Sequence, residues 1–261
     1  MAEMGFILAG FGVGALVGLT GVGGGSLMTP LLIFLFGIPP VTAVGTDLLF
    51  AAITKAGGIW SHQRQGNIRT DLLLLLGAGS LPTALLTVYY LGSLRAAGSE
   101  LDGLIQVGLG IALVLTSLVL LFRRSVHRLG RMAKLWLPSW RRLRPWITVL
   151  CGMILGLLVP ISSIGAGALG AAMLLFLYPR LPTRVIVGTD LAHAVPLTAV
   201  AGLGHLQMGS VDFALLGMLL AGSLPGIWLG SQASNLVPER VMRPLLASML
   251  MLIGVKFMFV N

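Results

Sequence analysis

Residues 101–122 read LDGLIQVGLGIALVLTSLVLLF, a run with a single acidic side chain, Asp102, and no basic one. A helix of this length is about 33 Å long, enough to cross a bilayer core of about 30 Å. The whole chain of 261 residues has the same character, with 56% hydrophobic residues, 10% charged residues and a mean hydropathy of +0.98. Soluble domains average about 25% charged residues. The composition therefore excludes a soluble enzyme and a disordered chain, and it indicates a polytopic membrane protein.

Further apolar runs lie on both sides of this stretch, and their period is helical rather than alternating, which argues against a β-barrel. The expected helical segments lie at about 4–20, 26–37, 42–60, 71–91, 101–122, 146–160, 167–178, 185–203, 212–232 and 241–259. Two of them, 26–37 and 167–178, would be only about 18 Å long. The sequence thus predicts an all-α fold, and it leaves open whether the two short segments cross the bilayer or re-enter.

The stretch directly after residue 122 is strongly basic and contains no acidic residue up to residue 145. Its basic residues are Arg123, Arg124, Arg128, Arg131, Lys134, Arg141, Arg142 and Arg144. The positive-inside rule predicts that residues 123–145 form a cytoplasmic loop of a bacterial inner-membrane protein, in contact with anionic lipid headgroups. The net charge of +9 then needs no nucleic-acid partner. The loop separates residues 1–122 from residues 146–261, which we expect to be two membrane-embedded repeats.

A motif in the first half recurs in the second. Gly45-Thr46-Asp47-Leu48 returns as Gly188-Thr189-Asp190-Leu191, a spacing of 143 residues (45 to 188), and the same spacing pairs 78–82 with 221–225. Arg64 and Arg69, however, correspond to uncharged Gln207 and acidic Asp212, so matching loops differ in charge. Five segments per half is also an odd number. Both facts predict an inverted-topology repeat, the arrangement in which secondary transporters place their site at the repeat interface.

Each half also contains a glycine-rich interruption, at residues 18–26 and 160–167, where a continuous helix is not expected. We expect broken or re-entrant helical hairpins whose second arms present free N–H groups and a positive dipole end to an anion. The predicted anion-binding residues of these tips are Thr20, Gly23, Gly24, Gly25, Ser26, Ser162, Ser163, Gly165 and Gly167. The alternative is that the glycines serve only close helix packing.

Asp47 and Asp190 lie inside apolar helices, where a charge costs about 2.5–3.5 kcal/mol or more. Two roles stay open for them: carrying a proton, or bracing the glycine tips. Thr46 and Thr189 are expected to assist anion binding, and His193, one turn after Asp190, is either a substrate ligand or an interior histidine. Lys55 is expected to extend to the cytoplasmic surface, with attraction of the anion as the alternative.

The stretch Val22-Gly23-Gly24-Gly25-Ser26 followed by Pro30, together with the two Gly-Thr-Asp-Leu copies, resembles the sulfite exporter TauE/SafE family. The resemblance covers essentially the whole chain. It implies movement of sulfite, sulfonates or related sulfur-containing organic anions across the bacterial inner membrane. Many family members have serine where Asp47 and Asp190 stand, and Ala172 replaces proline near the position that matches Pro30.

These features predict a secondary transporter that moves a small anion by alternating access, with energy from a gradient because no ATP-binding loop is present. No catalytic residue, cofactor or metal site is expected, and the single cysteine, Cys151, cannot form a disulfide framework. An anion channel of the same architecture is one alternative. An intramembrane serine hydrolase that uses Ser26 with His62 or His193 is the other. The oligomeric state stays open, and a homo-oligomer is compatible with the sequence.

Overall fold

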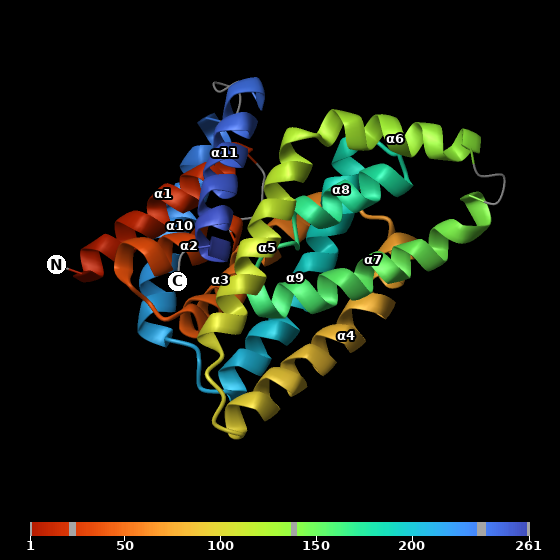
Figure 1. Cartoon of the computed structure of the whole chain (residues 1–261). Coiled ribbons are helices and arrows are strands. Elements are labelled where there is room, and N and C mark those ends of the chain that lie inside the picture. Colours follow the sequence, from red (N-terminus) through yellow and green to blue (C-terminus); the bar gives the residue numbers. More distant parts are fainter. Residues whose placement is uncertain (1, 21–24, 137–139, 234–238, 260–261) are drawn as a thin grey trace.

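The computed structural model describes residues 2–20, 25–136, 140–233 and 239–259, and these residues form eleven helices and no strand (Figure 1). The helices are α1 (Ala2–Thr20), α2 (Gly25–Phe36), α3 (Pro40–Arg64), α4 (Thr70–Ala96), α5 (Asp102–Leu121), α6 (Arg123–Trp136), α7 (Trp140–Ser162), α8 (Ala168–Leu177), α9 (Thr183–Gln207), α10 (Phe213–Ala233) and α11 (Glu239–Phe259). The all-helical prediction is confirmed, and a helix lies at each of the ten expected segments.

The additional helix, α6, lies in the basic stretch that was predicted to be a loop, so that part of the prediction is wrong. Arg, Leu, Met, Lys and Ala all favour helices. Val126, Leu129 and Met132, three residues apart, also place apolar side chains on one side of α6. Gly130 packs against the backbone carbonyl group of Phe176 at the end of α8. The basic stretch is therefore an amphipathic helix docked on the protein.

The helices have the length and surface of a membrane protein. Within the described part of the chain, five segments are long and apolar enough to cross a bilayer, namely Thr70–Ala96, Asp102–Leu121, Arg142–Ser162, Thr183–Gln207 and Phe213–Gln232. Large apolar side chains point away from the protein, for example Leu74, Trp146 and Leu252, with 72%, 76% and 73% of their surface exposed. Apolar surface on this scale is suited to contact with lipid. The chain is a multi-pass membrane protein.

The two halves use the same helix pairings. The main contacts between helices join α1 with α10, α4 with α7, α5 with α11 and α3 with α9. The counterparts of α1, α3, α4 and α5 in the second half are α7, α9, α10 and α11. Exchanging counterparts turns the α1–α10 pair into the α7–α4 pair, and it leaves the α5–α11 and α3–α9 pairs unchanged. In the α1–α10 crossing Gly14 lies against the carbonyl group of Ser223, and in the α7–α4 crossing Gly156 lies against that of Ser80. These contacts use corresponding residues.

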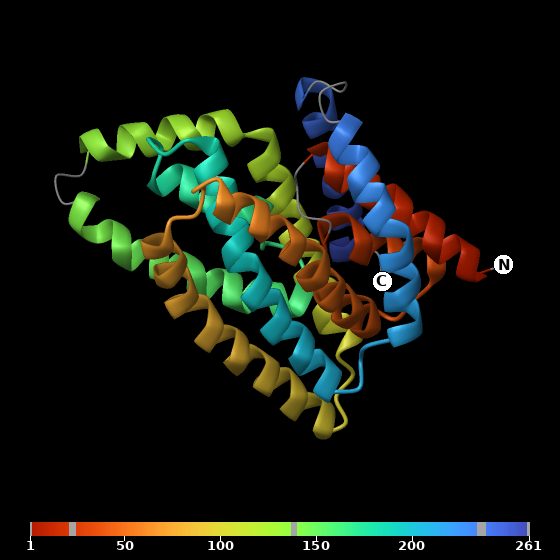
Figure 2. The ribbon, with the colours of Figure 1, turned by 180° about the vertical axis from the view of Figure 1, so that it is seen from behind.

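Helices α3 and α9 run antiparallel through the centre of the molecule (Figure 2). The backbone N–H of Asp212, just after α9, donates to Thr46 Oγ1 near the start of α3 over 3.1 Å. The backbone N–H of Arg69, just after α3, donates to Thr189 Oγ1 near the start of α9 over 3.0 Å. Thr46 corresponds to Thr189 and Arg69 to Asp212. Two equivalent hydrogen bonds thus join the halves, one at each end of this helix pair.

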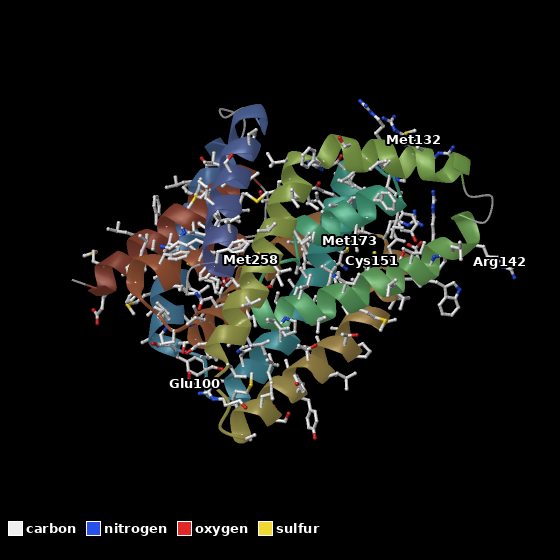
Figure 3. The ribbon with its side chains drawn as sticks, viewed as in Figure 1. Glu100, Met132, Arg142, Cys151, Met173 and Met258 are labelled. Carbon is white, nitrogen blue, oxygen red and sulfur yellow. The ribbon has the colours of Figure 1, made fainter. Side chains whose placement is uncertain are left out.

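Basic side chains gather at one end of the molecule, which we call the basic face. It comprises Arg69, Arg123, Arg128, Arg131, Arg142, Arg144, Arg180 and Arg184. Tyr178 lies within it, because its hydroxyl is 2.9 Å from Thr148 Oγ1 and its ring lies 5.5 Å from the guanidinium carbon of Arg144. Arg142 points away from the helices at this end, and Glu100 lies at the opposite end (Figure 3). The molecule therefore has a basic end, whereas the opposite end carries charges of both signs, such as Arg95, Glu100 and Asp102.

Candidate functional site

The second helix interruption lies where the sequence predicts it, because α7 ends at Ser162 and α8 begins at Ala168. We call residues 163–167 the second tip. Gly165 and Gly167 have φ values of +119° and +140°, which glycine adopts readily. Ser163 has a φ of +58°, which is uncommon for residues other than glycine. Ser162 Oγ accepts the N–H of Ile164 over 3.1 Å. The break between α7 and α8 is thus a defined turn, and Ser162 forms part of its internal bonding.

A buried histidine forms a hydrogen bond with the last turn of α7. His205 on α9 donates from Nε2 to the carbonyl oxygen of Pro160 over 2.8 Å. A carbonyl oxygen can only accept, so Nε2 carries the proton. The last carbonyl groups of a helix have no partner within the helix. His205 therefore ties the end of α7, just before the second tip, to α9.

In the first half, α1 ends at Thr20 and α2 begins at Gly25. Gly23 and Gly24 lie outside the described residues, as do the side chains of Thr20 and Ser26. The anion-binding roles expected for Thr20, Gly23, Gly24, Gly25 and Ser26 stay predictions.

Seven polar side chains meet where the two halves join, and we call them the buried polar cluster. They are Thr29 of α2, Asp47 and Lys55 of α3, Ser80 of α4, Ser163 of the second tip, and Asp190 and His193 of α9. All seven are buried, and Lys55, at 7% exposure, is the most exposed of them. Both halves contribute, and the cluster is closed to solvent and lipid in this conformation.

Asp47 lies between side chains of the two halves. Thr29 Oγ1 donates to Asp47 Oδ2 over 2.5 Å, and Ser163 lies beside the same carboxyl group. The other oxygen, Asp47 Oδ1, has no hydrogen-bond partner among the described residues. The carboxyl group thus lies between the arm after the first interruption and the second tip.

Asp190 occupies the corresponding place in the second half. Its Oδ1 lies against Gly170 in the first turn of α8, where a Cβ atom would overlap with it. One turn later, His193 Nε2 lies 2.7 Å from Ser80 Oγ, which joins α9 to α4. Asp190 Oδ1 and His193 Nδ1 have no hydrogen-bond partner within the described ranges.

Lys55 does not extend to the membrane surface, so that expectation is wrong. Its Nζ donates to the carbonyl oxygen of Ala166 in the second tip over 2.7 Å. The physical reason is length, because α3 continues to Arg64, about 13 Å beyond Lys55. A lysine so far from the helix end cannot reach the headgroups, whereas the broken helix offers it a backbone carbonyl group.

The cluster differs from the predicted site in two ways. It brings together Asp47, Asp190, Ser163 and His193, but the hydroxyl groups of Thr46 and Thr189 are used in the two hydrogen bonds between the halves. The cluster also contains residues that were not predicted as ligands, which are Thr29, Lys55 and Ser80. The signal that could have identified them is an isolated polar residue within an apolar run.

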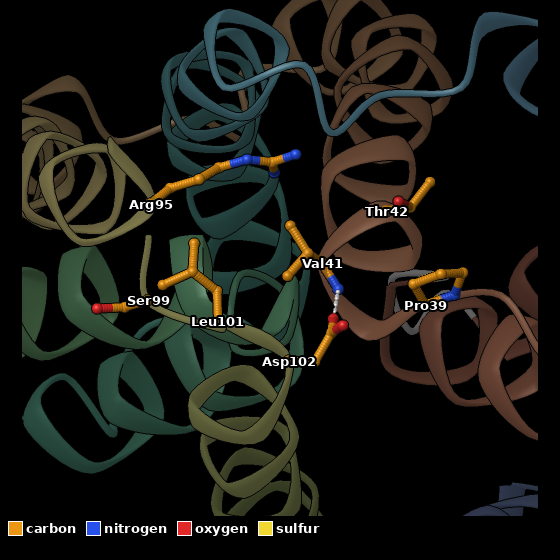
Figure 4. A pocket seen from close by; sticks show the side chains of 7 residues that line it. All are labelled: Pro39, Val41, Thr42, Arg95, Ser99, Leu101 and Asp102. Atoms are coloured by element: carbon orange, nitrogen blue, oxygen red, sulfur yellow. Dashed lines mark hydrogen bonds between the residues drawn. The ribbon is translucent and has the colours of Figure 1, made fainter. Parts of the chain in front are cut away.

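A cavity of about 200 Å³ lies at the end opposite the basic face (Figure 4). Its lining residues are Pro39, Val41, Thr42, Arg95, Ser99, Leu101 and Asp102. Asp102 Oδ1 accepts the backbone N–H of Val41 over 3.0 Å and so caps the start of α3. Asp47 lies six residues after Val41, about 9 Å further along the same helix. The cavity therefore lies at the end of the helix that carries Asp47 and Lys55.

The sequence matches known proteins over almost its whole length. The model of the family described as "Sulfite exporter TauE/SafE" matches residues 6–257. "Probable membrane transporter protein YjnA" of Bacillus subtilis is 40% identical over 96% of this chain and 97% of the relative. "Probable membrane transporter protein YdhB" of the same organism is 29% identical over 94% and 98%. "Probable membrane transporter protein MJ0441" of Methanocaldococcus jannaschii is 27% identical over 95% and 92%.

No solved structure matches the chain significantly. A family match of this extent, a relative of this identity and a fold of membrane-spanning helices agree with one another. The chain belongs to the sulfite exporter TauE/SafE family of membrane transporters.

Proposed function

We propose that this protein is a secondary transporter of a small sulfur-containing anion, such as sulfite or an organosulfonate, and that it works by alternating access. The observation that carries the proposal is the buried polar cluster, which holds a lysine, two carboxyl groups, a histidine and three hydroxyl groups between the two halves. Charged residues inside a membrane protein mark pathways of ions or substrates. The family model adds the class of substrate.

The proposal includes an inverted relation of the two halves. The antiparallel α3–α9 pair and its two equivalent hydrogen bonds support it, because corresponding helices that run in opposite directions require oppositely oriented halves. In such repeats the substrate site lies near the bilayer midplane, between broken helices. Rocking of one half against the other would expose the cluster to each side in turn.

We assign the basic face to the cytoplasm of a bacterial cell and the cavity at Arg95 to the outside. The positive-inside rule supports this orientation. Helix α6, with its apolar residues on one side and with Arg128 and Arg131 exposed, would then lie at the inner-membrane surface among anionic headgroups. Arg95 would attract anions to the cavity from the outer solution.

The test is flux in proteoliposomes that contain only the purified protein. We expect saturable uptake of labelled sulfite or an organosulfonate that depends on a pH gradient. Gly167→Val, which forces a branched residue into a backbone with φ of +140°, should abolish uptake while the protein still inserts. Normal uptake by this variant would refute a role of the second tip. Rapid conductance that does not saturate would identify a channel instead.

A further inference from the structure

Lys55 is the cation in the middle of the buried polar cluster. Its Nζ donates to the carbonyl oxygen of Ala166, a contact between residues 111 positions apart that crosses from one half to the other. It also lies close enough to Asp47, Asp190 and His193 to interact with their charges. An ammonium group has three N–H donors, and burying it is costly unless its charge is balanced.

Four atoms near this ammonium group lack hydrogen-bond partners in the part of the chain that the structure describes. They are Asp47 Oδ1, Asp190 Oδ1, His193 Nδ1 and Ser163 Oγ. Buried polar atoms almost always have a partner in native proteins. Four such atoms around one lysine indicate a site built to hold a further polar molecule.

The repeat is broken at the lysine and at the histidine. Residues at the spacing of 143 place Thr198 opposite Lys55 and Phe50 opposite His193, whereas Asp47 and Asp190 are matched. Thr198 is buried and its hydroxyl group donates to the carbonyl oxygen of Ala194. The repeat thus supplies two carboxyl groups but a single lysine. An anion that pairs with this lysine has one binding position in the cluster rather than two equivalent ones.

We propose that Lys55 is the residue that binds the transported anion, and that the anion replaces the carbonyl oxygen of Ala166 as the partner of its ammonium group. This inference rests on the function proposed above. Loss of the bond to Ala166 frees the second tip from α3. Anion binding and release of the tip are therefore one event, which gives alternating access a physical trigger.

Charge balance adds a requirement. The charged and titratable groups that face the site are Asp47 and Lys55 on α3 and Asp190 and His193 on α9, while α2, α4 and the second tip contribute the hydroxyl groups of Thr29, Ser80 and Ser163. Two carboxylates and one ammonium group leave a net negative charge, which repels an anion. With both carboxyl groups protonated the charge becomes positive. The anion therefore binds together with protons, and its affinity rises as the pH falls.

The experiment measures thermal stabilisation of the purified protein in detergent by sodium salts of sulfite, 2-hydroxyethanesulfonate, sulfate, acetate and chloride. The salts are compared at equal ionic strength, at acid and at neutral pH. The key variant is Lys55→Gln, because glutamine keeps an N–H donor for Ala166 and removes the charge. We expect at least about a tenfold rise in the Kd of the stabilising anion. Lys55→Arg should retain binding better than Lys55→Gln. Lys256→Met, outside the cluster, is the matched control and should bind like the unmodified protein.

The outcomes separate the two proposals. If no anion stabilises the unmodified protein, the proposed function fails and this inference fails with it. If an anion stabilises the unmodified protein and Lys55→Gln equally, the inference is overturned and the proposed function stands. If Lys55→Gln does not fold, Lys55→Arg provides the test. Binding of the anion by this variant at low pH but not at neutral pH supports the inference. Binding that does not depend on pH overturns it.

Discussion

The hydroxyl group of Thr29 donates a hydrogen bond to Asp47 Oδ2, and the side chain of Asp47 is fully buried. Thr29→Val keeps the shape of the side chain and removes this donor, so Asp47 Oδ2 loses its partner. A buried group left without a partner costs about 1–3 kcal/mol. We expect a lower unfolding midpoint for Thr29→Val and a nearly normal one for Thr29→Ser, measured by thermal unfolding in detergent. Equal midpoints for the two variants would show that the hydrogen bond does not stabilise the protein.

Asp47 is either a proton carrier or a brace, and one substitution separates these roles. Asp47→Asn cannot lose a proton but can still accept the hydroxyl of Thr29. If Asp47 carries a transported proton, flux through the variant should depend less steeply on pH, because of the two carboxyl groups in the cluster only Asp190 can still gain or lose a proton. Asp71→Asn is the control, because Asp71 is exposed and paired with Arg69 over 2.6 Å, outside the cluster. An unchanged pH profile for Asp47→Asn would leave only the bracing role.

Individual site residues differed in how far the sequence could predict them. Asp47 and Asp190 could be predicted, since a lone carboxyl group in an apolar helix is costly and implies a partner or a cavity. The position of Lys55 could not, because its partner is a backbone carbonyl group 111 residues away, and any residue type supplies such a group. The role of Thr46 and Thr189 could not be predicted from the sequence either, because their partners are the backbone N–H groups of Asp212 and Arg69.

At the scale of helices, two matched crossings depend on glycine. A Cβ atom at Gly14 would overlap with the carbonyl group of Ser223, and one at Gly156 with that of Ser80. Gly14→Ala and Gly156→Ala should each force their helix pair apart and destabilise the protein by about 1–3 kcal/mol. Gly12→Ala is the control on α1, because nothing lies within 4 Å of that position. Thermal unfolding of the three variants checks this, and equal stability of Gly12→Ala and Gly14→Ala would contradict the close crossing.

Helix lengths and the break at 163–167 followed from the sequence, because glycine, serine and proline interrupt apolar runs in a recognisable way. The helical state of α6 did not. A high density of arginine is typical of a loop at the membrane surface, whereas the structure has a helix that contacts α8 through Gly130. Docking onto another element leaves little trace in local composition.

For the whole molecule, charge on the two ends should decide how an anion approaches. Arg95 lines the cavity at the end opposite the basic face. Arg95→Gln should raise the KM for uptake from that side by roughly tenfold with little change in kcat. The reason is that electrostatic attraction raises the rate at which the anion reaches the cavity but does not change the later transport steps. The effect should shrink at high salt. Arg184→Gln, on the basic face, is the control, and an equal change in KM for both variants would argue against entry through the cavity.

The proposed inverted relation of the halves predicts on which side of the membrane each helix end lies. Gln63 and Gln207 lie near the ends of α3 and α9, which are corresponding helices that run antiparallel. In a Cys151→Ser background, Gln207→Cys should react with an impermeant maleimide in intact cells, and Gln63→Cys should react only after the membrane is opened. Ser99→Cys beside the cavity should behave like the first, and Ser125→Cys on α6 like the second. A parallel repeat would place both helix ends on one side, so labelling of Gln63→Cys and Gln207→Cys from the same side would exclude the inverted arrangement and, with it, a shared site between oppositely oriented halves.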